Sequence, residues 1–364
     1  MIVNKFPFYR GSGAHIYGVS WDGTSTTLWT RTDNAANFAD PVPYVAGATN
    51  YGSPFDNLYP WKDMTIVEDS SAGTMVKIPK FWYKLTQNGA GMSIQISDTA
   101  LNGYSVCPAC MDRGDGKGER DYILVGRYHC ASTYKSTTGV KPTASKKRSA
   151  FRNGIQNLGS GVYMMDWATR FTLFLLYLVE YANWDTQATI GSGCGNGSAT
   201  QNMGYTDSMP YHTGTTLSKR TSYGLGTQYR YIEGLWDNVH DWIDGCYHNS
   251  NGLMLILNPS NFSDSANGTS VGTLSNGFPS AFSVKTVNNT FPLFIPSAAS
   301  GSNSTYSCDK WNFVASYQYL FVGGYYSNSR EYGLFCFRCY IDTSGSYIGS
   351  RPMKLPDFSS AIKP

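Results

Sequence analysis

The chain has 364 residues, enough for two or three domains or for one large domain with long insertions. Charged residues make up only 15% of it, against roughly 25% in an average soluble protein, and the net charge is +3. The nearest approach to a basic block is Lys146-Lys147-Arg148, which predicts a solvated loop, so the composition argues against nucleic-acid binding.

The first residues, MIVNKFPFYRGSGAHIYG, lack the basic and apolar segments of a signal peptide. The most apolar stretch, residues 171–179, is shorter than the roughly 20 residues that span a bilayer. We therefore expect synthesis in a cytoplasm and no membrane insertion. High contents of Gly, Ser, Thr, Asn and Tyr are typical of β structure with long ordered loops, as in extracellular binding proteins and virion appendages.

Residues 1–90 predict a small β-rich N-terminal module. Apolar and polar side chains alternate over residues 15–22, and residues 27–31 and 75–85 continue with strand patterns. The segment 33–60 is rich in Asn, Pro and Gly and predicts an ordered loop.

Residues 91–148 predict further strands around a polar, Gly-rich loop at 112–120. This loop could suggest a calcium or phosphate site. It lacks the EF-hand spacing and is not followed by the lysine and serine of a phosphate-binding loop. A Gly-rich turn is the simpler interpretation.

Residues 166–181 predict a helix that is buried on most sides, because apolar residues follow a helical period on one face and also occupy much of the other. Glu180 lies near its C-terminal end, where a negative charge opposes the helix dipole, so we expect a hydrogen-bonding partner for it rather than a catalytic role. Residues 191–226 and 258–304 are polar and show little periodicity, which predicts long loops.

Eight cysteines include two pairs with C-x-x-C spacing. These are Cys107 with Cys110 and Cys336 with Cys339. A zinc site could use both pairs, or the first pair with His129 or Cys130. The pairs are far apart in sequence, so we expect buried free thiols and neither metal nor cofactor.

The five histidines are scattered and match no triad or metal spacing. His240 lies between two tryptophan-containing segments and predicts a core or loop residue rather than a catalytic base. The sequence therefore predicts no catalytic residue.

The last fifth of the chain, residues 311–351, is unusually rich in tyrosine: WNFVASYQYLFVGGYYSNSREYGLFCFRCYIDTSGSYIGSR. Tyr offers a large, rigid contact area, while Ser, Asn and Gly offer adaptable hydrogen bonds, and this mixture is typical of recognition surfaces. A Tyr-rich sheet edge packed on another element is the alternative interpretation. The two-residue spacing of Arg338 and Tyr340 would place both side chains on one face of a strand.

Three features together resemble the formylglycine-generating-enzyme branch of the C-type-lectin fold, over roughly residues 100–355. Residues 232–242, IEGLWDNVHDW, are similar to a core segment of that branch. The helix ending near Glu180 resembles that of phage and prophage members. Residues 345–351, GSYIGSR, are similar to the end of the variable region in target proteins of diversity-generating retroelements, in which error-prone copying of template adenines randomises chosen codons.

The resemblance implies an α+β fold, with the N-terminal module followed by a C-type-lectin-like domain over residues 91–364 that carries a variable region at about 311–351. It implies an invariant frame formed by Leu334, Phe335, Ile348, Gly349 and Arg351, with Trp236 and Trp242 in the core. It also implies that the ligand-binding side chains are displayed, namely Tyr317, Tyr319, Tyr325, Tyr326, Asn328, Arg330, Tyr332, Arg338, Tyr340, Ile341 and Tyr347.

On this basis we expect a ligand-binding variable protein without enzymatic activity, which recognises a bacterial surface protein or glycan in a virion, at a phage tail tip, or at a cell surface. Other tail proteins and further copies of the chain are the expected additional partners, and a trimer would suit a tail fibre. Two alternatives stay open: a fixed-specificity structural or lectin-like protein, and a formylglycine-generating-type oxidase. The oxidase would need more widely spaced catalytic cysteines than Cys336 and Cys339.

Overall fold

The computed structural model describes residues 13–357, apart from 194–196, 223, 225, 265–266, 289–290, 314–317 and 342. Strands hold 34% of the residues and helices 10%. The fold is therefore β-rich, and the predicted α+β class is wrong. The helical period was easy to recognise in the one long helix, whereas many segments that read as loops form short strands.

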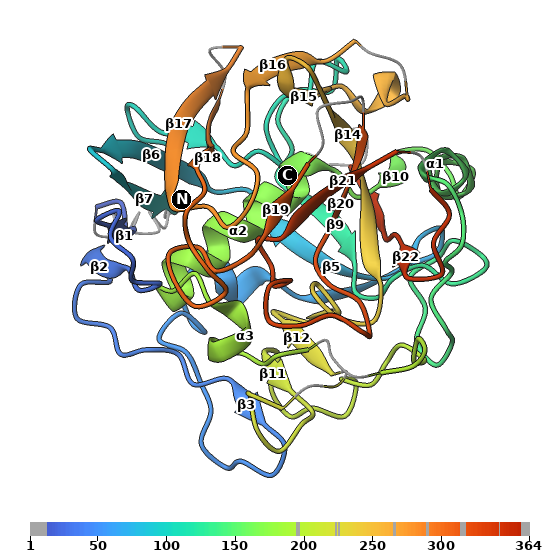
Figure 1. The fold of residues 1–364 in the computed structure, drawn as a ribbon, viewed down its shortest axis with the longest axis horizontal. Helices are drawn as coiled ribbons and strands as arrows, with labels where there is room; N and C mark the ends of the chain where they lie inside the picture. Colours follow the sequence, from blue (N-terminus) through green and yellow to red (C-terminus); the bar gives the residue numbers. More distant parts are fainter. Residues whose placement is uncertain are drawn as a thin grey trace, which may run out of the picture.

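The strands form four sheets and a separate hairpin (Figure 1). The first sheet has the order β2 (Thr30–Asp33), β1 (Ile16–Trp21), β7 (Gly91–Ser97), β6 (Trp82–Asn88), β8 (Ser105–Val106). The second has the order β10 (Val162–Met164), β23 (Pro352–Lys354), β9 (Tyr122–Gly126), β5 (Gly73–Pro79), β4 (Ile66–Asp69). The third has the order β13 (Ile232–Glu233), β12 (Thr227–Tyr229), β11 (Gly214–Thr215), β3 (Tyr44–Val45).

The fourth and largest sheet contains the tyrosine-rich tract. Its order is β16 (Thr269–Gly272), β15 (Gly252–Leu255), β14 (His240–Asn249), β20 (Gln318–Val322), β21 (Phe337–Tyr340), β19 (Trp311–Asn312), and β22 (Ile348–Gly349) pairs in parallel with β14. The hairpin consists of β17 (Ala281–Val287) and β18 (Phe291–Ala298). It lies within residues 258–304, which the sequence had predicted to be a loop.

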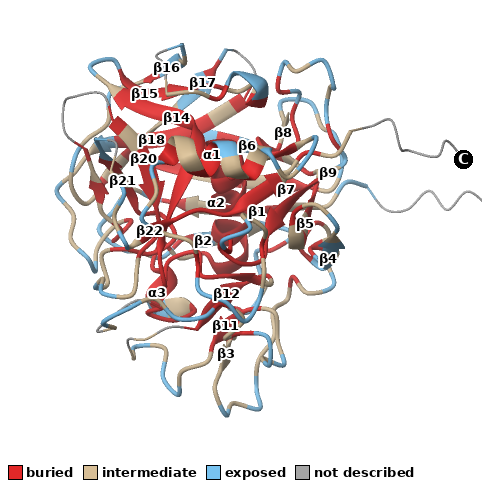
Figure 2. Ribbon diagram, turned by 90° about the vertical axis from the view of Figure 1, so that its right-hand side faces the viewer, coloured by how far each residue is buried: buried red, intermediate tan, exposed pale blue. Residues whose placement is uncertain are grey.

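Helix α2 (Trp167–Tyr181) lies at the centre of the molecule, between the sheets (Figure 1). All 15 of its residues are buried, as Figure 2 shows. The Asp166 carboxylate caps its first turn by accepting a hydrogen bond from Thr169 N, and Ala182 ends it in a left-handed conformation. The predicted helix is thus confirmed.

The other helices are short. They are α1 (Arg148–Gln156), α3 (Thr186–Thr189) and the 3-10 turns η1 (Trp61–Asp63) and η2 (Pro259–Asn261). Arg148 is buried at the start of α1, and its Nη2 lies 2.8 Å from Asp264 Oδ1. The prediction of a solvated loop is therefore wrong for Arg148, which a distant carboxylate neutralises, whereas Lys146 and Lys147 lie in a loop and Lys147 is exposed.

The N-terminal segment shares its sheets with the rest of the chain. The boundary predicted near residue 90 falls in the turn of the β6–β7 hairpin, and β5 pairs with β9. Side chains from both sides of residue 90 also meet in one core cluster. Residues 1–90 therefore do not form a separate module within the described structure.

Among the described residues, no helix is both long and apolar enough to cross a membrane.

Candidate functional site

The residues that the resemblance assigned to the frame are all buried. Arg351, Ile348 and Leu334 have no exposed surface, and Arg351 Nε donates to Asp241 Oδ2 at 2.8 Å. Trp236 and Trp242 are likewise buried in the core. The tract is therefore held by buried residues on both sides of its more exposed tyrosines.

Four tyrosines from three parts of the tract meet at one place, which we call the tyrosine cluster: Tyr325, Tyr326, Tyr332 and Tyr347. The ring centroids of Tyr325 and Tyr347 are 4.8 Å apart, and those of Tyr325 and Tyr326 are 5.2 Å apart in an edge-on arrangement. Tyr325, Tyr326 and Tyr347 are half-buried, whereas Tyr332 is only 9% exposed. The expectation that Tyr332 is displayed is thus wrong, because its ring packs against His240 and the Arg338 guanidinium.

His240, at the start of β14, forms the floor of the tyrosine cluster. Its ring centroid lies 5.2 Å from that of Tyr325 and 6.2 Å from that of Tyr347. Nδ1 donates to Gly323 O at 2.7 Å, which leaves Nε2 as an acceptor that is buried without a hydrogen-bond partner in the described structure. Burial and, to a smaller extent, Arg338 lower the pKa of His240 to about 3, so the ring is neutral at physiological pH. The prediction of a core histidine is confirmed.

Arg338 connects the cluster to the outer face of β20 and β21. Its guanidinium lies 5.3 Å from the centroid of Tyr332 and 5.7 Å from that of Phe321. The neighbouring Phe337 and Cys339 are buried, so the predicted alternation along this strand is confirmed. Tyr340 is 55% exposed and Ile341 is 62% exposed, which is unusual for apolar side chains of this size.

Two polar residues of the tract stabilise the loop that carries the tyrosines. Asn328 Oδ1 accepts a hydrogen bond from Tyr325 N at 2.9 Å, and Tyr326 N donates to Asn238 O at 3.1 Å. Arg330 Nη2 lies 3.1 Å from Asp185 Oδ2, just before α3. Asn328 and Arg330 are thus half-buried and engaged within the protein, which the sequence pattern did not predict.

Asp309 fixes the far end of the same loop. Its carboxylate accepts hydrogen bonds from Gly333 N at 2.7 Å and Phe335 N at 2.8 Å. Burial raises the pKa of Asp309 to about 8 even though these donors oppose the shift. The sequence contained no signal for this role, because Asp309 lies 24 and 26 positions before the residues that it binds.

The remaining predicted residue on β20, Tyr319, lies opposite Tyr340 in the strand register. The guanidinium of Arg148 lies 4.1 Å from the Tyr319 ring centroid, so α1 covers part of this tyrosine. Tyr317 lies outside the described residues.

The cysteines show an environment that does not favour thiolate chemistry. The seven described cysteines are free and buried. Burial raises the pKa of both Cys336 and Cys339 well above the usual value, whereas a nucleophilic thiol requires a lowered pKa. No group of three or more His, Cys, Asp or Glu side chains suited to a metal ion occurs in the described part of the chain.

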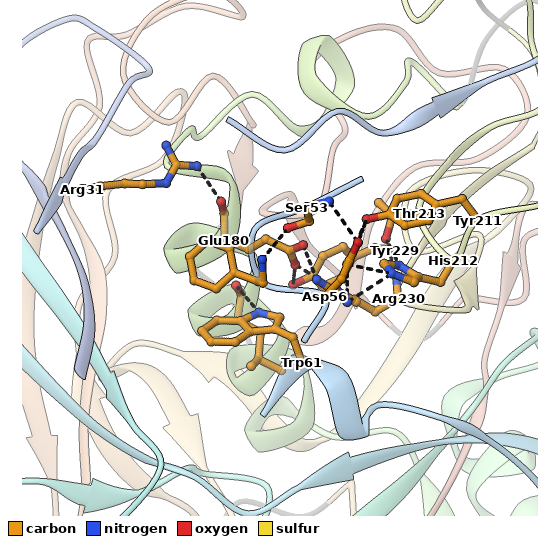
Figure 3. A network of polar contacts seen from close by, with 12 residues as sticks. Arg31, Ser53, Asp56, Trp61, Glu180, Tyr211, His212, Thr213, Tyr229 and Arg230 are labelled. Atoms are coloured by element: carbon orange, nitrogen blue, oxygen red, sulfur yellow. Dashed lines mark hydrogen bonds and ion pairs between the residues drawn. The ribbon is translucent and has the colours of Figure 1, made fainter. Parts of the chain in front are cut away.

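Glu180 has the hydrogen-bonding partners that its position predicted. Its Oε2 accepts from Tyr229 OH at 3.0 Å and from Arg230 Nε at 3.1 Å, and Arg230 Nη1 in turn lies 3.0 Å from Asp56 Oδ1 (Figure 3). Burial opposes ionisation of Asp56, but the hydrogen bond from His212 and the charge of Arg230 together lower its pKa to about 2. This network attaches the 33–60 loop to α2 and serves the fold rather than the tract.

Taken together, the site offers aromatic faces and hydroxyl groups on loops of the tract and the Arg338 guanidinium on β21. His240 and Asp309, which support these loops, are both buried and hydrogen-bonded to backbone groups. Comparison with protein-family models and with curated proteins finds no match to this chain.

Proposed function

We propose that the chain is a ligand-binding protein that recognises a bacterial surface protein or glycan, in a phage tail or at a cell surface. The binding surface consists of Tyr325, Tyr326 and Tyr347 with Arg338, Tyr340 and Ile341, and we call it the recognition surface. The proposal rests on one observation: tyrosines from three segments of one tract lie close together and are supported by buried frame residues. Aromatic and Arg side chains at such positions are the usual energetic anchors of binding.

We further propose that the tract is diversified by a retroelement. A surface that tolerates many side chains requires support that does not depend on them. The buried frame, Asp309 and His240 supply this support through buried contacts and backbone hydrogen bonds. Residues 325–326 and 340–341 can then change with little effect on the core.

The binding proposal is tested by replacing Tyr326, Tyr340 and Ile341 together by alanine. We expect binding of the labelled protein to cells of its host strain to fall more than tenfold, while the melting temperature shifts by only a few degrees. The matched control is Tyr122→Ala, a half-buried tyrosine on β9 whose loss should leave binding unchanged. Unfolding of the triple variant would show that these side chains belong to the core, and unchanged binding would refute the recognition surface.

The diversification proposal is tested by deep sequencing of the 3′ end of the gene and its flanks in a growing population of the source. We expect substitutions confined to codons of residues 311–347, matching adenines in a nearby imperfect repeat. A tract as invariant as the rest of the gene, without such a repeat, would instead indicate a protein of fixed specificity.

A further inference from the structure

Arg338 differs from the other arginines that the structure describes. Each of the others either forms an ion pair with a carboxylate or donates a hydrogen bond to a backbone carbonyl. The side chain of Arg338 has neither kind of partner among the described residues, and none of its nitrogen atoms is buried. The recognition surface therefore carries a guanidinium whose charge is open to solvent.

Arg330, which belongs to the same tract, shows the contrast. Its Nη2 lies 3.1 Å from Asp185 Oδ2, so a carboxylate of the protein itself neutralises its charge. Glu331 is the described carboxylate nearest to Arg338 along the chain, and it forms no ion pair with Arg338. The charge of Arg338 is thus available to an acidic group of a ligand.

Two aromatic rings hold the Arg338 guanidinium in place. It lies 5.3 Å from the ring centroid of Tyr332 and 5.7 Å from that of Phe321, and both rings are buried. A guanidinium is weakly hydrated, and its planar set of donors matches the two oxygens of a carboxylate. Because the rings already restrict this side chain, it loses less conformational freedom when an anion binds.

Apolar side chains lie next to this charge. Arg338 and Tyr340 are two residues apart on β21 and therefore share one face of the sheet. Tyr340 is 55% exposed, and Ile341, which follows it, is 62% exposed. The recognition surface thus combines one open positive charge with exposed aromatic and aliphatic side chains.

This combination favours a protein over a glycan as the ligand. An exposed Ile side chain has no aromatic face on which a sugar ring could stack, and it gains most when another apolar side chain buries it. The anionic groups of a protein surface are the carboxylates of Asp and Glu. The surface that matches the recognition surface is therefore an acidic side chain beside an apolar one.

We propose that the recognition surface binds a protein through a carboxylate that pairs with the Arg338 guanidinium, while an apolar side chain beside that carboxylate packs on Tyr340 and Ile341. This inference rests on the proposed function and narrows its ligand from a protein or glycan to a protein with an acidic contact site. Hydrogen bonds between ionised partners are stronger than those between neutral groups, and Arg is a common anchor of interfaces.

The test measures binding of the labelled protein to cells of its host strain after three separate treatments. A carbodiimide with ethanolamine converts surface carboxylates to neutral amides, a protease removes surface proteins, and periodate oxidises sugars. We expect binding to fall more than tenfold on amidated cells and on protease-treated cells. Binding to periodate-treated cells should equal binding to untreated cells.

Variants of Arg338 assign the effect to this side chain. Arg338→Gln removes the charge, so we expect more than tenfold weaker binding to untreated cells, no further loss on amidated cells, and a melting temperature within a few degrees of the wild type. Arg338→Lys keeps the charge without the planar donors and should bind with intermediate strength. Lys84→Gln is the matched control, because Lys84 is exposed on β6 in another sheet and its loss should leave binding unchanged.

Three outcomes would overturn the proposal. The first is full binding of the wild type to amidated cells, a result that does not depend on the folding of any variant. The second is full binding by Arg338→Gln. The third is loss of binding on periodate-treated but not on protease-treated cells, which would assign the acidic group to a glycan. Failure of the proposed function is distinguishable, because the triple alanine variant of Tyr326, Tyr340 and Ile341 would then bind untreated cells as well as the wild type does.

Discussion

Gly323 shows how single residues determine the position of the tyrosine cluster. It follows β20 with a φ of 70°, and its carbonyl accepts the hydrogen bond that orients His240. A Cβ at this position would lie 2.3 Å from Leu235 O, which is backbone and cannot move aside. Two constraints therefore coincide here, a left-handed backbone and a close approach of two chains.

Gly323→Ala should lower the free energy of unfolding by more than about 2 kcal/mol, because a left-handed alanine alone costs about 1–2 kcal/mol and the clash adds to it. Gly47→Ala is the control, since Gly47 has a φ of 85° but nothing within 4 Å of the added Cβ. Denaturant unfolding gives the loss of unfolding free energy in each variant, and the difference between the two losses measures the contribution of the clash. Equal losses in the two variants would contradict the role of the close approach.

Among the elements, α2 depends on a partner outside its own sequence. Its Glu180 is fully buried and is neutralised by Arg230, which lies 50 residues further along the chain. Removing one member of such a pair leaves the other buried without compensation, which is more costly than losing an exposed pair. The helix and the third sheet are thus coupled through one ion pair.

Glu180→Ala should destabilise the protein by about 3 kcal/mol, at the lower end of the range for broken buried pairs, because Asp56 still contacts Arg230. Asp40→Ala is the comparison: it removes the partner of Arg31, but its carboxylate side chain is 85% exposed, so the effect should be small. Thermal unfolding of both variants measures the difference. A loss of similar size in the two variants would show that burial of the Glu180 pair is not decisive.

For the whole molecule, buried ionisable groups set the dependence of stability on pH. Burial lowers the pKa of His129 and His240 to about 3 and also lowers that of His212. Below about pH 6.5 these three histidines therefore bind more protons in the unfolded chain than in the native protein. Burial raises the pKa of Glu233 to about 7 and that of Asp309 to about 8, so these groups bind more protons in the native protein up to those values.

Between about pH 4.5 and pH 6.5 the two sets of groups oppose each other, because burial also raises the pKa of Asp237, so stability should change little there. Above pH 6.5 stability should fall as Glu233 and Asp309 lose their protons. Below about pH 3.8 the carboxyl groups no longer oppose the histidines, and His129 and His240 each remove up to about 1.4 kcal/mol per pH unit. Melting temperatures from pH 3 to pH 9 would show this asymmetry, and a constant value between pH 4.5 and pH 3 would contradict it.

Features set by neighbouring residues were predictable from the sequence. The helical period of α2 and the alternation of Arg338 and Tyr340 both arise within a few residues of one another. The sequence indicated that Glu180 needs a hydrogen-bonding partner, because its charge opposes the helix dipole. It did not indicate that this partner is Arg230.

Features set by contacts between distant segments were decided only by the tertiary structure. The fold class depended on pairing strands such as β17 with β18, which lie in a segment whose sequence carries little periodicity of its own. The same reason explains why Tyr332 is buried against His240 while Tyr326 is only half-buried: both are tyrosines in one tract, and contacts with distant segments distinguish them. Composition thus determined what kind of surface this chain could form, and long-range packing decided which of its side chains can reach a ligand.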